Sequence, residues 1–364
     1  MQLFKCQMCG QVLYFENIAC EKCGSRLGYL PDLGTMSAVE PDGATWIAQA
    51  NPDKRYRFCA NWEDNACNWM VRADGGETYC QACQHNRTIP DLCAPHNHRN
   101  WQKIEDAKRR LFYSLIKLNL PAPTAASGDS EPLVFDFLAD PPGGPRVMTG
   151  HDNGVITIAL GEADDAIREA ARASMGELYR TLLGHFRHEV GHYYWDKLVR
   201  DGNESERFRS LFGDERQDYA QALARHYEQG APAGWRERFV SAYATMHPWE
   251  DWAETFAHYL HMVDTLEMAS AFGITIAPDI ADDPTLETRL HFDPHRVYRV
   301  QTLVEAWLPL TYAVNCLNRS MGQPDLYPFV IAPKVVEKLA YVHELVHRPR
   351  AGAEPAHARD TAFA

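Results

Sequence analysis

The pattern of hydrophobic and polar positions divides the chain into a strand-rich start and a largely helical remainder. Between residues 31 and 54, short apolar runs separated by turn residues predict short strands. Between residues 100 and 119, apolar residues recur at every third or fourth position, which predicts an amphipathic helix. Strands are predicted again at 133–138 and within 147–160, where an Asp-Asn-Gly turn indicates a hairpin.

The helical part begins near residue 164, where apolar residues return to helical spacing. A segment with several Pro and Ser residues at 121–132 precedes it and is expected to be a loop. The predicted helices cover 172–200, 216–229, 234–245, 248–270 and 296–316.

Five residues in the helix predicted at 172–200 carry the clearest chemical signal. His188-Glu189-Val190-Gly191-His192 forms an H-E-x-x-H motif. Two histidines at i and i+4 lie on one face of a helix, so both imidazoles can bind one metal ion. Glu189 then lies beside the ion, where its carboxylate can take a proton from a bound water molecule. The motif predicts a zinc hydrolase, and in particular a peptidase.

A second copy of the motif, His343-Glu344-Leu345-Val346-His347, lies near the C-terminus. A catalytic zinc ion has three protein ligands and one open position for water, so another ligand must come from elsewhere. Only 17 residues follow the second copy, and they contain no predicted helix that could hold a ligand. We therefore expect the first copy to bind the metal and the second to belong to a packed C-terminal helix.

The helix predicted at 248–270 offers the missing ligand. Pro248 suits a first helical position, and Glu250 and Glu254 are one turn apart and share a face. One carboxylate can bind zinc while the other accepts the free ring N–H of a ligand histidine. Neighbouring Trp and Phe residues argue that both carboxylates are paired, because an unpaired carboxylate on an apolar face is costly.

The order H-E-x-x-H, a long insertion and then Tyr-x6-Glu-x3-Glu resembles the gluzincin metallopeptidases of the lethal-factor type. Nearly the full chain, with its cysteine-rich start and the run from Asn86 to Leu92, also resembles bacterial zinc-binding metallopeptidases that begin with a zinc ribbon. In zincins a strand before the active-site helix lines the cleft, and we expect 154–160 to do so here and to accept an extended substrate. The resemblance implies the zinc ligands His188, His192 and Glu250, the general base Glu189, the orienting residue Glu254 and the oxyanion donor Tyr243. The alternative for Tyr243 is a buried aromatic residue of the core.

Eight cysteines in the first 83 residues predict two further metal sites. Cys6, Cys9, Cys20 and Cys23 form two C-x2-C pairs, each followed by glycine, which is the zinc-ribbon pattern. A second set comprises Cys59, Cys67, Cys80 and Cys83, with Cys93, His85, His96 and His98 nearby as possible replacements for one ligand. Iron is an alternative ion for four thiolates, and zinc is the one expected. Cys316 stands alone and is expected to be a small core residue.

Charge and hydropathy argue against two kinds of partner. The net charge is −13, and the cysteine-rich start has no Lys/Arg stripe with interleaved aromatic residues, so we expect no nucleic-acid partner. No apolar run approaches the ~18 residues that span a bilayer, so we expect no membrane association. The chain enters the cysteine pattern at once without a signal peptide, which favours a cytoplasmic protein.

The predicted fold class is α+β, a mainly helical zincin-type metallopeptidase domain preceded by small four-cysteine modules of the zinc-ribbon type. We expect one catalytic and two structural zinc ions, a peptide or protein substrate, and a protein partner that binds the ribbon. The alternative is a zinc-ribbon interaction protein, or a nucleic-acid-associated one, with an inactive or accessory zincin fold. The expected organisation is a zinc ribbon at 1–32, a second four-cysteine module at 33–99, a helix and linker at 100–132, the metallopeptidase domain at 133–348 and a disordered tail at 349–364.

Overall fold

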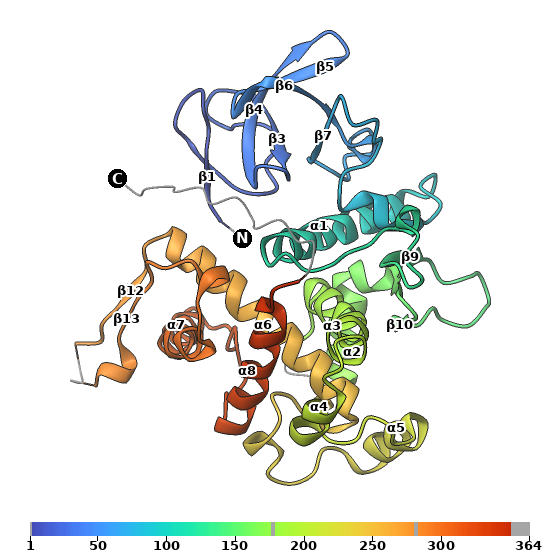
Figure 1. Cartoon of the computed structure of the whole chain (residues 1–364), viewed down its shortest axis with the longest axis vertical. Coiled ribbons are helices and arrows are strands. Elements are labelled where there is room, and N and C mark those ends of the chain that lie inside the picture. The colour runs from blue at the N-terminus through green and yellow to red at the C-terminus, as the bar shows by residue number, and fades with distance from the viewer. Residues whose placement is uncertain (1, 176–178, 280–282, 351–364) are drawn as a thin grey trace.

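The N-terminal part of the chain is built on antiparallel strands (Figure 1). The computed structural model describes residues 2–175, 179–279 and 283–350, so the predicted tail lies, from residue 351, outside the described residues. A two-stranded sheet of β1 (Phe4–Lys5) and β2 (Val12–Leu13) precedes a five-stranded sheet with the order β3-β4-β5-β6-β7. The strands of the larger sheet are β3 (Arg26–Leu30), β4 (Thr35–Asp42), β5 (Thr45–Ala48), β6 (Asn51–Phe58) and β7 (Met70–Arg72).

A long helix, α1 (Pro95–Lys117), connects this sheet to a second one of four strands with the order β10-β11-β9-β8. Strands β8, β9 and β11 are parallel, and β10 pairs with β11 in the antiparallel sense. The expectation that 154–160 accepts an extended substrate is therefore wrong, because β11 already pairs with β9 and β10 on its two sides, and β10 is the edge strand. The strands are β8 (Asn86–Thr88), β9 (Val134–Leu138), β10 (Gly150–Asp152) and β11 (Val155–Ala159).

Helices make up most of the chain after β11. They are α2 (Asp165–Met175), α3 (Leu182–Tyr194), α4 (Ser205–Phe212), α5 (Tyr219–Gln229), α6 (Pro248–Ala271), α7 (Val300–Ser320) and α8 (Pro333–His347). A π-helical turn, η5 (Trp195–Arg200), continues α3, and a small hairpin of β12 (Thr275–Ile276) and β13 (Thr288–Arg289) precedes α7. The short 3-10 turns are η1 (Ala60–Trp62), η2 (Cys83–His85), η3 (Ala125–Ser127), η4 (Leu160–Ala163), η6 (Trp235–Glu237), η7 (Tyr243–Thr245), η8 (Pro284–Leu286) and η9 (Pro294–Arg296).

Two helix predictions differ from the structure because polar side chains cap backbone groups. The helix predicted at 172–200 is not continuous, since the Thr181 side chain accepts a hydrogen bond from the Gly184 backbone N–H and starts α3 anew. The helix predicted at 234–245 is replaced by the single turns η6 and η7. Between them, the Ser241 hydroxyl accepts from the Ala244 backbone N–H, which favours a new turn over a continuing helix.

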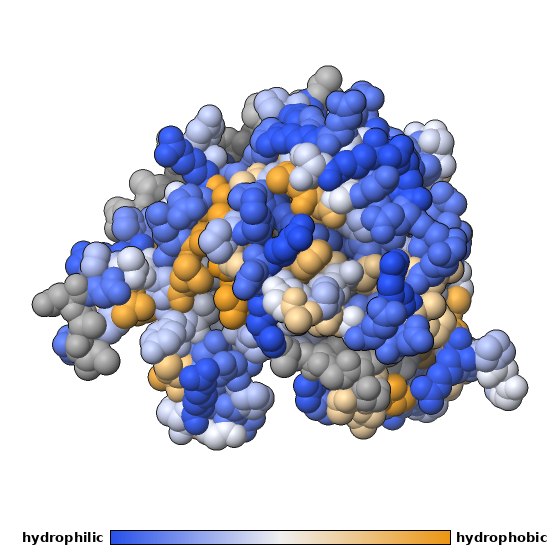
Figure 2. All heavy atoms as spheres, turned by 90° about the horizontal axis from the view of Figure 1, so that it is seen from below, coloured by the Kyte–Doolittle hydropathy of each residue, from blue (hydrophilic) through white to orange (hydrophobic). Residues whose placement is uncertain are grey.

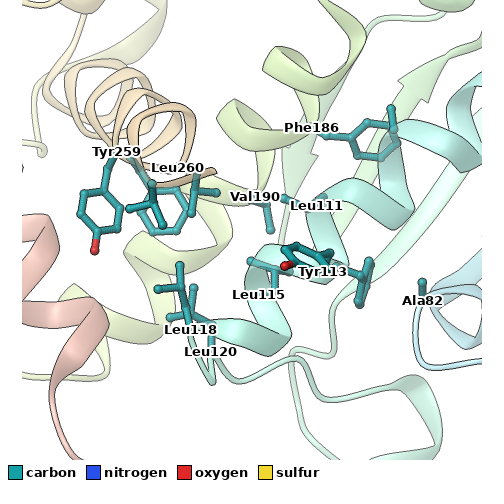
Figure 3. Packing of buried hydrophobic residues seen from close by; sticks show 14 of the residues in the cluster. Ala82, Leu111, Tyr113, Leu115, Leu118, Leu120, Phe186, Val190, Tyr259 and Leu260 are labelled. Carbon is teal, nitrogen blue, oxygen red and sulfur yellow. The ribbon is translucent and has the colours of Figure 1, made fainter. Parts of the chain in front are cut away.

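The larger of two buried clusters runs from the N-terminal sheet to α8 and includes α1 residues, and a small second cluster lies within the five-stranded sheet. On one face of α1, Leu111 and Leu115 belong to the same buried cluster as Phe186 and Val190 of α3 (Figure 3). On the opposite side, Tyr113 lies 5.4 Å from Phe15 of the N-terminal part, measured between ring centroids. The packing of α1 therefore joins the cysteine-rich part to the helix that carries the H-E-x-x-H motif.

No helix within the described ranges is both long enough and apolar enough to cross a membrane. The face seen from below is mainly hydrophilic, with hydrophobic side chains gathered in a few patches (Figure 2).

Candidate functional site

Helices α3 and α6 approach each other closely because position 191 is glycine. A Cβ atom at this position would lie 3.0 Å from the Cα of Ala253 and 3.2 Å from its carbonyl oxygen, which is tighter than ordinary contact. The Trp252 indole N–H donates a hydrogen bond of 2.8 Å to the Gly191 carbonyl and fixes the crossing. The first turn of α6, which begins at Pro248 after the capping residue His247, thereby faces the H-E-x-x-H side of α3.

Three predicted ligands meet at this crossing. Nε2 of His188 lies 3.2 Å from Nε2 of His192 and 2.9 Å from Oε2 of Glu250, and Nε2 of His192 lies 3.5 Å from Oε1 of Glu250. In a tetrahedral zinc site with bonds of 2.0–2.1 Å, neighbouring donor atoms are separated by about 3.3 Å. The donor set and its spacing therefore fit a zinc ion.

The charge distribution at this site also favours a cation. Burial alone would lower the pKa of His188, but Glu250 and Glu254 raise it well above its usual value. Burial alone would raise the pKa of Glu250, but His192 and His188 lower it well below its usual value. Among the described residues, Oε2 of Glu250 is buried and makes no hydrogen bond of normal geometry, although it lies 2.9 Å from Nε2 of His188. A buried carboxylate oxygen without a hydrogen bond is costly, and a bound cation would remove this cost.

Glu254 contacts the imidazole of His188 from the side away from Glu250. Its Oε1 lies 2.7 Å from Nδ1 of His188. This contact holds a proton on Nδ1, so Nε2, which faces Glu250, is the nitrogen whose lone pair could bind a metal ion. This arrangement agrees with the expected roles, in which Glu250 is a ligand and Glu254 orients the ligand His188.

The three donor residues lie in a cleft of about 750 Å³. Glu189 is 9% exposed and lines this cleft. Tyr243 lines it too, with its ring 5.9 Å from the ring of His188. Burial, with further effects of Glu250 and Tyr219, raises the pKa of Tyr243 above its usual value, so its hydroxyl keeps a proton to donate. The remaining lining residues are Thr149, Gly150, His151, Asp152, Asn153, Trp195, Asp196, Arg200, Glu215, Arg216, Tyr219 and Trp249.

Tyr219 is a residue of the site that the sequence did not single out. It begins α5, and its hydroxyl donates a hydrogen bond of 2.9 Å to Oε1 of Glu250. No motif relates Tyr219 to Glu250, which is 31 residues away, so the contact depends on how α5 packs against α6. The carboxylate of Glu250 is thereby held on one oxygen while the other faces His188.

The second H-E-x-x-H motif lies on α8, away from this site. The Tyr259 hydroxyl lies 3.0 Å from Nδ1 of His343 and 3.1 Å from Nε2 of His347, so it is a hydrogen-bond partner of both imidazoles. Glu344 points outward and forms an ion pair of 2.5 Å with Arg207. The structure thus supports the expectation of a packed helix. Its buried residues include Leu339, Val342 and Val346.

The first four cysteines come together between β1, β2 and β3. Sγ of Cys6 lies 3.8 Å from Sγ of Cys23, and Sγ of Cys9 lies 3.6 Å from Sγ of Cys20. Zinc–sulfur bonds of 2.3 Å separate neighbouring sulfurs of a tetrahedral site by about 3.8 Å, so this spacing fits a zinc ion. Gly10, which follows the first pair, has a φ of 73°, as the tight turn requires.

Cys59, Cys67, Cys80 and Cys83 form a second cluster, and all four are buried. Sγ of Cys67 and Sγ of Cys80 are 3.7 Å apart, again the spacing of a tetrahedral zinc–thiolate site. The alternative ligands do not join it: Cys93 is exposed, and Nδ1 of His85 lies 2.7 Å from the Leu133 carbonyl oxygen. Cys316, expected in the core, is also exposed, because it lies on the outward face of α7.

Buried cations on α1 lie beside the second cluster. Lys108 and Arg109 are 0% and 4% exposed. Burial alone would lower the pKa of Arg109, but Cys67 and Asp106 raise it above its usual value. Lys108 forms a buried ion pair of 2.8 Å with Glu105, which in turn lies 3.5 Å from Sγ of Cys83. Four thiolates around one Zn²⁺ carry a net negative charge, and these cations offset it.

A fourth group of possible metal ligands is buried between α1, α3 and α6. It consists of Asp264, Glu267 and His295. Lys117 forms an ion pair of 2.8 Å with Glu267, and Arg187 forms one with Asp264. Because cations of the chain already face both carboxylates, we interpret this group as a structural network that joins the three helices.

Comparison with known proteins matches two parts of the chain to two family models. The sequence model of the family described as "Putative zinc-binding metallo-peptidase" matches residues 97–345, and a zinc-ribbon domain model matches residues 3–94. Uncharacterized proteins of Mycobacterium bovis and of two Mycobacterium tuberculosis strains are each 43% identical to this chain over 362 residues, which covers 99% of it and 100% of each relative. No solved structure gave a significant match. This chain therefore belongs to that zinc-binding metallo-peptidase family, and it carries a zinc-ribbon domain in front of the peptidase region.

Proposed function

We propose that this chain is a zinc-dependent peptidase of the gluzincin type, with its catalytic ion held by His188, His192 and Glu250. The observation that carries the proposal is the meeting of three donor atoms, 2.9–3.5 Å apart, in a cleft that also contains Glu189 and Tyr243. Two imidazoles and one carboxylate are the ligand set of zinc hydrolases that keep a position open for water.

The roles of the protein side chains follow from their positions around this donor set. When bound, zinc would lower the pKa of a coordinated water molecule to about 7 and so supply a nucleophile at neutral pH. Glu189 accepts a proton from the attacking water and gives it to the amine that leaves. The Tyr243 hydroxyl donates a hydrogen bond to the carbonyl oxygen as negative charge develops there, an effect of about 3 kcal/mol for one donor. Glu254 holds His188 in the tautomer that presents Nε2.

The edge strand β10 supplies a backbone surface for the substrate. Residues 149–153, which include β10, line the cleft, and within the described part of the chain no strand pairs with the side of β10 away from β11. An extended peptide that adds to this edge would lie across the donor set, held by main-chain hydrogen bonds. The role expected for 154–160 is therefore reassigned to β10.

Substitution of the general base tests the proposal. Glu189→Gln removes the proton acceptor but changes no metal ligand, so we expect about three zinc ions per chain and loss of hydrolysis of a mixed peptide library. Glu344→Gln is the matched control, because it makes the same change in the second motif, and it should leave hydrolysis unchanged.

Hydrolysis by Glu189→Gln at the wild-type rate would contradict the assignment of the base. Wild-type protein with three zinc ions that cleaves no peptide in the library would contradict the peptidase proposal itself. It would favour a scaffold in which the zincin fold is accessory.

A further inference from the structure

His151 occupies a position in the cleft that the roles described so far leave unused. It is the central residue of the edge strand β10 and pairs with Ile156 of β11. Its ring lies parallel to the ring of His192, with 6.3 Å between centroids and 10° between planes. Its ring also meets the ring of Tyr193 edge-on at 6.3 Å. The side chain thus extends from the strand toward the helix that carries two of the zinc ligands.

A backbone hydrogen bond determines which nitrogen of His151 carries the proton. The Gly154 N–H donates to Nε2 at 3.1 Å, so Nε2 is an acceptor and the proton resides on Nδ1. The donor is itself fixed, because Gly154 has a φ of 83° and its carbonyl accepts from the Val134 N–H at 2.9 Å. Any side chain at position 154 would meet the Pro132 carbonyl oxygen at 2.4 Å, so this turn requires glycine.

The second nitrogen is left as a donor without a partner. Across the ranges that the structure describes, Nδ1 of His151 makes no hydrogen bond to the protein, while the residue lines the cleft. Because Nε2 accepts the hydrogen bond from the Gly154 N–H, the ring carries a single proton, on Nδ1, and is neutral. A neutral imidazole held in one tautomer is a hydrogen-bond donor whose direction is set before substrate binds.

Tyr243 and His151 lie on different sides of the donor set. The ring of Tyr243 is next to His188, whereas the ring of His151 is next to His192. A carbonyl group positioned over the metal ligands therefore has one donor available from the segment before α6 and another from β10. Two donors that converge on one oxygen are the arrangement by which acyl-transfer enzymes stabilise developing negative charge.

We propose that His151 is a further catalytic residue that donates a hydrogen bond from Nδ1 to the carbonyl oxygen of the scissile peptide bond. This inference rests on the proposed function and deepens it. As the water oxygen bonds to the carbonyl carbon, negative charge moves to the carbonyl oxygen, where the Nδ1–H stabilises it. The C–N bond then breaks, the carbonyl reforms, and Glu189 delivers the proton from water to the amine. His151 keeps its own proton throughout.

Two substitutions separate hydrogen bonding from packing. His151→Phe keeps an aromatic ring beside His192 but removes the donor, and we expect kcat to fall by about 100-fold with little change in KM. His151→Asn places an amide N–H near the position of Nδ1 and should recover at least a tenth of wild-type kcat. Zinc content and the midpoint of thermal unfolding should stay at wild-type values in both variants, because His151 is not a ligand.

A second readout does not depend on turnover. A phosphinic peptide carries a tetrahedral centre with a charged oxygen, so it should bind His151→Phe about 100-fold more weakly than wild type. The corresponding product peptide should bind both proteins equally.

Three results would overturn this inference and leave the zinc peptidase standing. They are wild-type kcat in His151→Phe, equal impairment of the Asn and Phe variants, and loss of zinc from His151→Phe. Absence of hydrolysis by wild type would overturn both proposals together.

Discussion

Tyr219 and Glu254 are not among the three proposed ligands, but they orient two of them, Glu250 and His188. Glu254 accepts from Nδ1 of His188, and Tyr219 donates to Oε1 of Glu250. Partners of this kind orient a ligand and tune its basicity, and their loss typically weakens metal binding by 10- to 100-fold. The metal affinity proposed for this site would therefore depend on five side chains, the three proposed ligands and the two residues that orient them.

Zinc binding should distinguish a ligand from its partner. Glu250→Ala removes one of three ligands, so we expect zinc content to fall from about three to about two ions per chain by elemental analysis. Tyr219→Phe removes only one hydrogen bond, so it should keep three ions but release one of them to a chelator at a 10- to 100-fold lower concentration than wild type does.

Retention of three ions by Glu250→Ala would move the third ligand elsewhere, with Glu254 as the next candidate. Equal chelator sensitivity of Tyr219→Phe and wild type would show that the Tyr219 contact is dispensable.

At the scale of residues, the sequence revealed what is local in the chain. His188 and His192 are one helical turn apart, as are Glu250 and Glu254, so their shared faces follow from helical periodicity alone. Tyr219 and His151 reach the same cleft from α5 and β10. Their place depends on packing between elements, and no spacing rule relates them to the motif.

At the scale of elements, the crossing of α3 and α6 determines whether the ligands meet. The crossing is close because Gly191 has no side chain. A Cβ atom added at this position would lie only 3.0 Å from the Cα of Ala253. Both neighbouring atoms of Ala253 belong to the helix backbone, so they cannot move aside as a flexible side chain could. The same five-residue motif therefore contains two of the proposed ligands, the proposed base and the glycine whose close contact brings Glu250 to them.

Enlarging position 191 should separate the helices. Gly191→Val places branched carbons against the backbone of α6, so we expect a loss of about 1–3 kcal/mol in the free energy of unfolding, as overpacked cores show. Because Glu250 moves away with α6, one zinc ion should also be lost. Thermal unfolding and elemental analysis of the same sample measure both effects.

Gly161→Ala is the control for this experiment, since its added Cβ would meet Ile167 only at 3.9 Å, an ordinary contact. It should change stability by no more than about 0.5 kcal/mol. Full zinc content in Gly191→Val would contradict the role of the close crossing.

Elements with long apolar periodicity were predictable, whereas those that depend on caps were not. The predicted helix at 248–270 agrees with α6 because its apolar residues recur over six turns after Pro248. The segment 234–245 has aromatic residues at helical spacing as well, but Ser241 caps a new turn within it. A side-chain hydrogen bond to the backbone can outweigh periodicity in a segment this short.

At the scale of the whole molecule, the cysteine-rich part and the peptidase region share one core. The buried cluster includes Phe15 and Trp69 on one side of α1 and Val190 on the other. The second four-cysteine cluster lies against α1 through Glu105 and Arg109. The sequence indicated the two cysteine sets by their spacing, but it did not reveal the five-stranded sheet that joins them, since strand order is not encoded in local periodicity.

Loss of one structural ion should therefore weaken the entire chain. Cys80→Ser removes a ligand of the second cluster, so we expect about two zinc ions instead of three and a lower midpoint of thermal unfolding in a single transition. Cys316→Ser is the matched control, because Cys316 is solitary and exposed, and it should match wild type in both measurements. Two separate transitions, with the helical part unaffected, would show that the modules fold independently.

The open edge of β10 has a consequence for what this molecule could cut. Amide and carbonyl groups along such an edge can be satisfied only by a chain whose own main-chain groups are unoccupied. A segment inside a stable helix or sheet of a target would have to melt locally before it could enter. Termini, frayed loops and unfolded chains would be accepted first, so the folding state of a target would govern its lifetime as strongly as the residues around the cut.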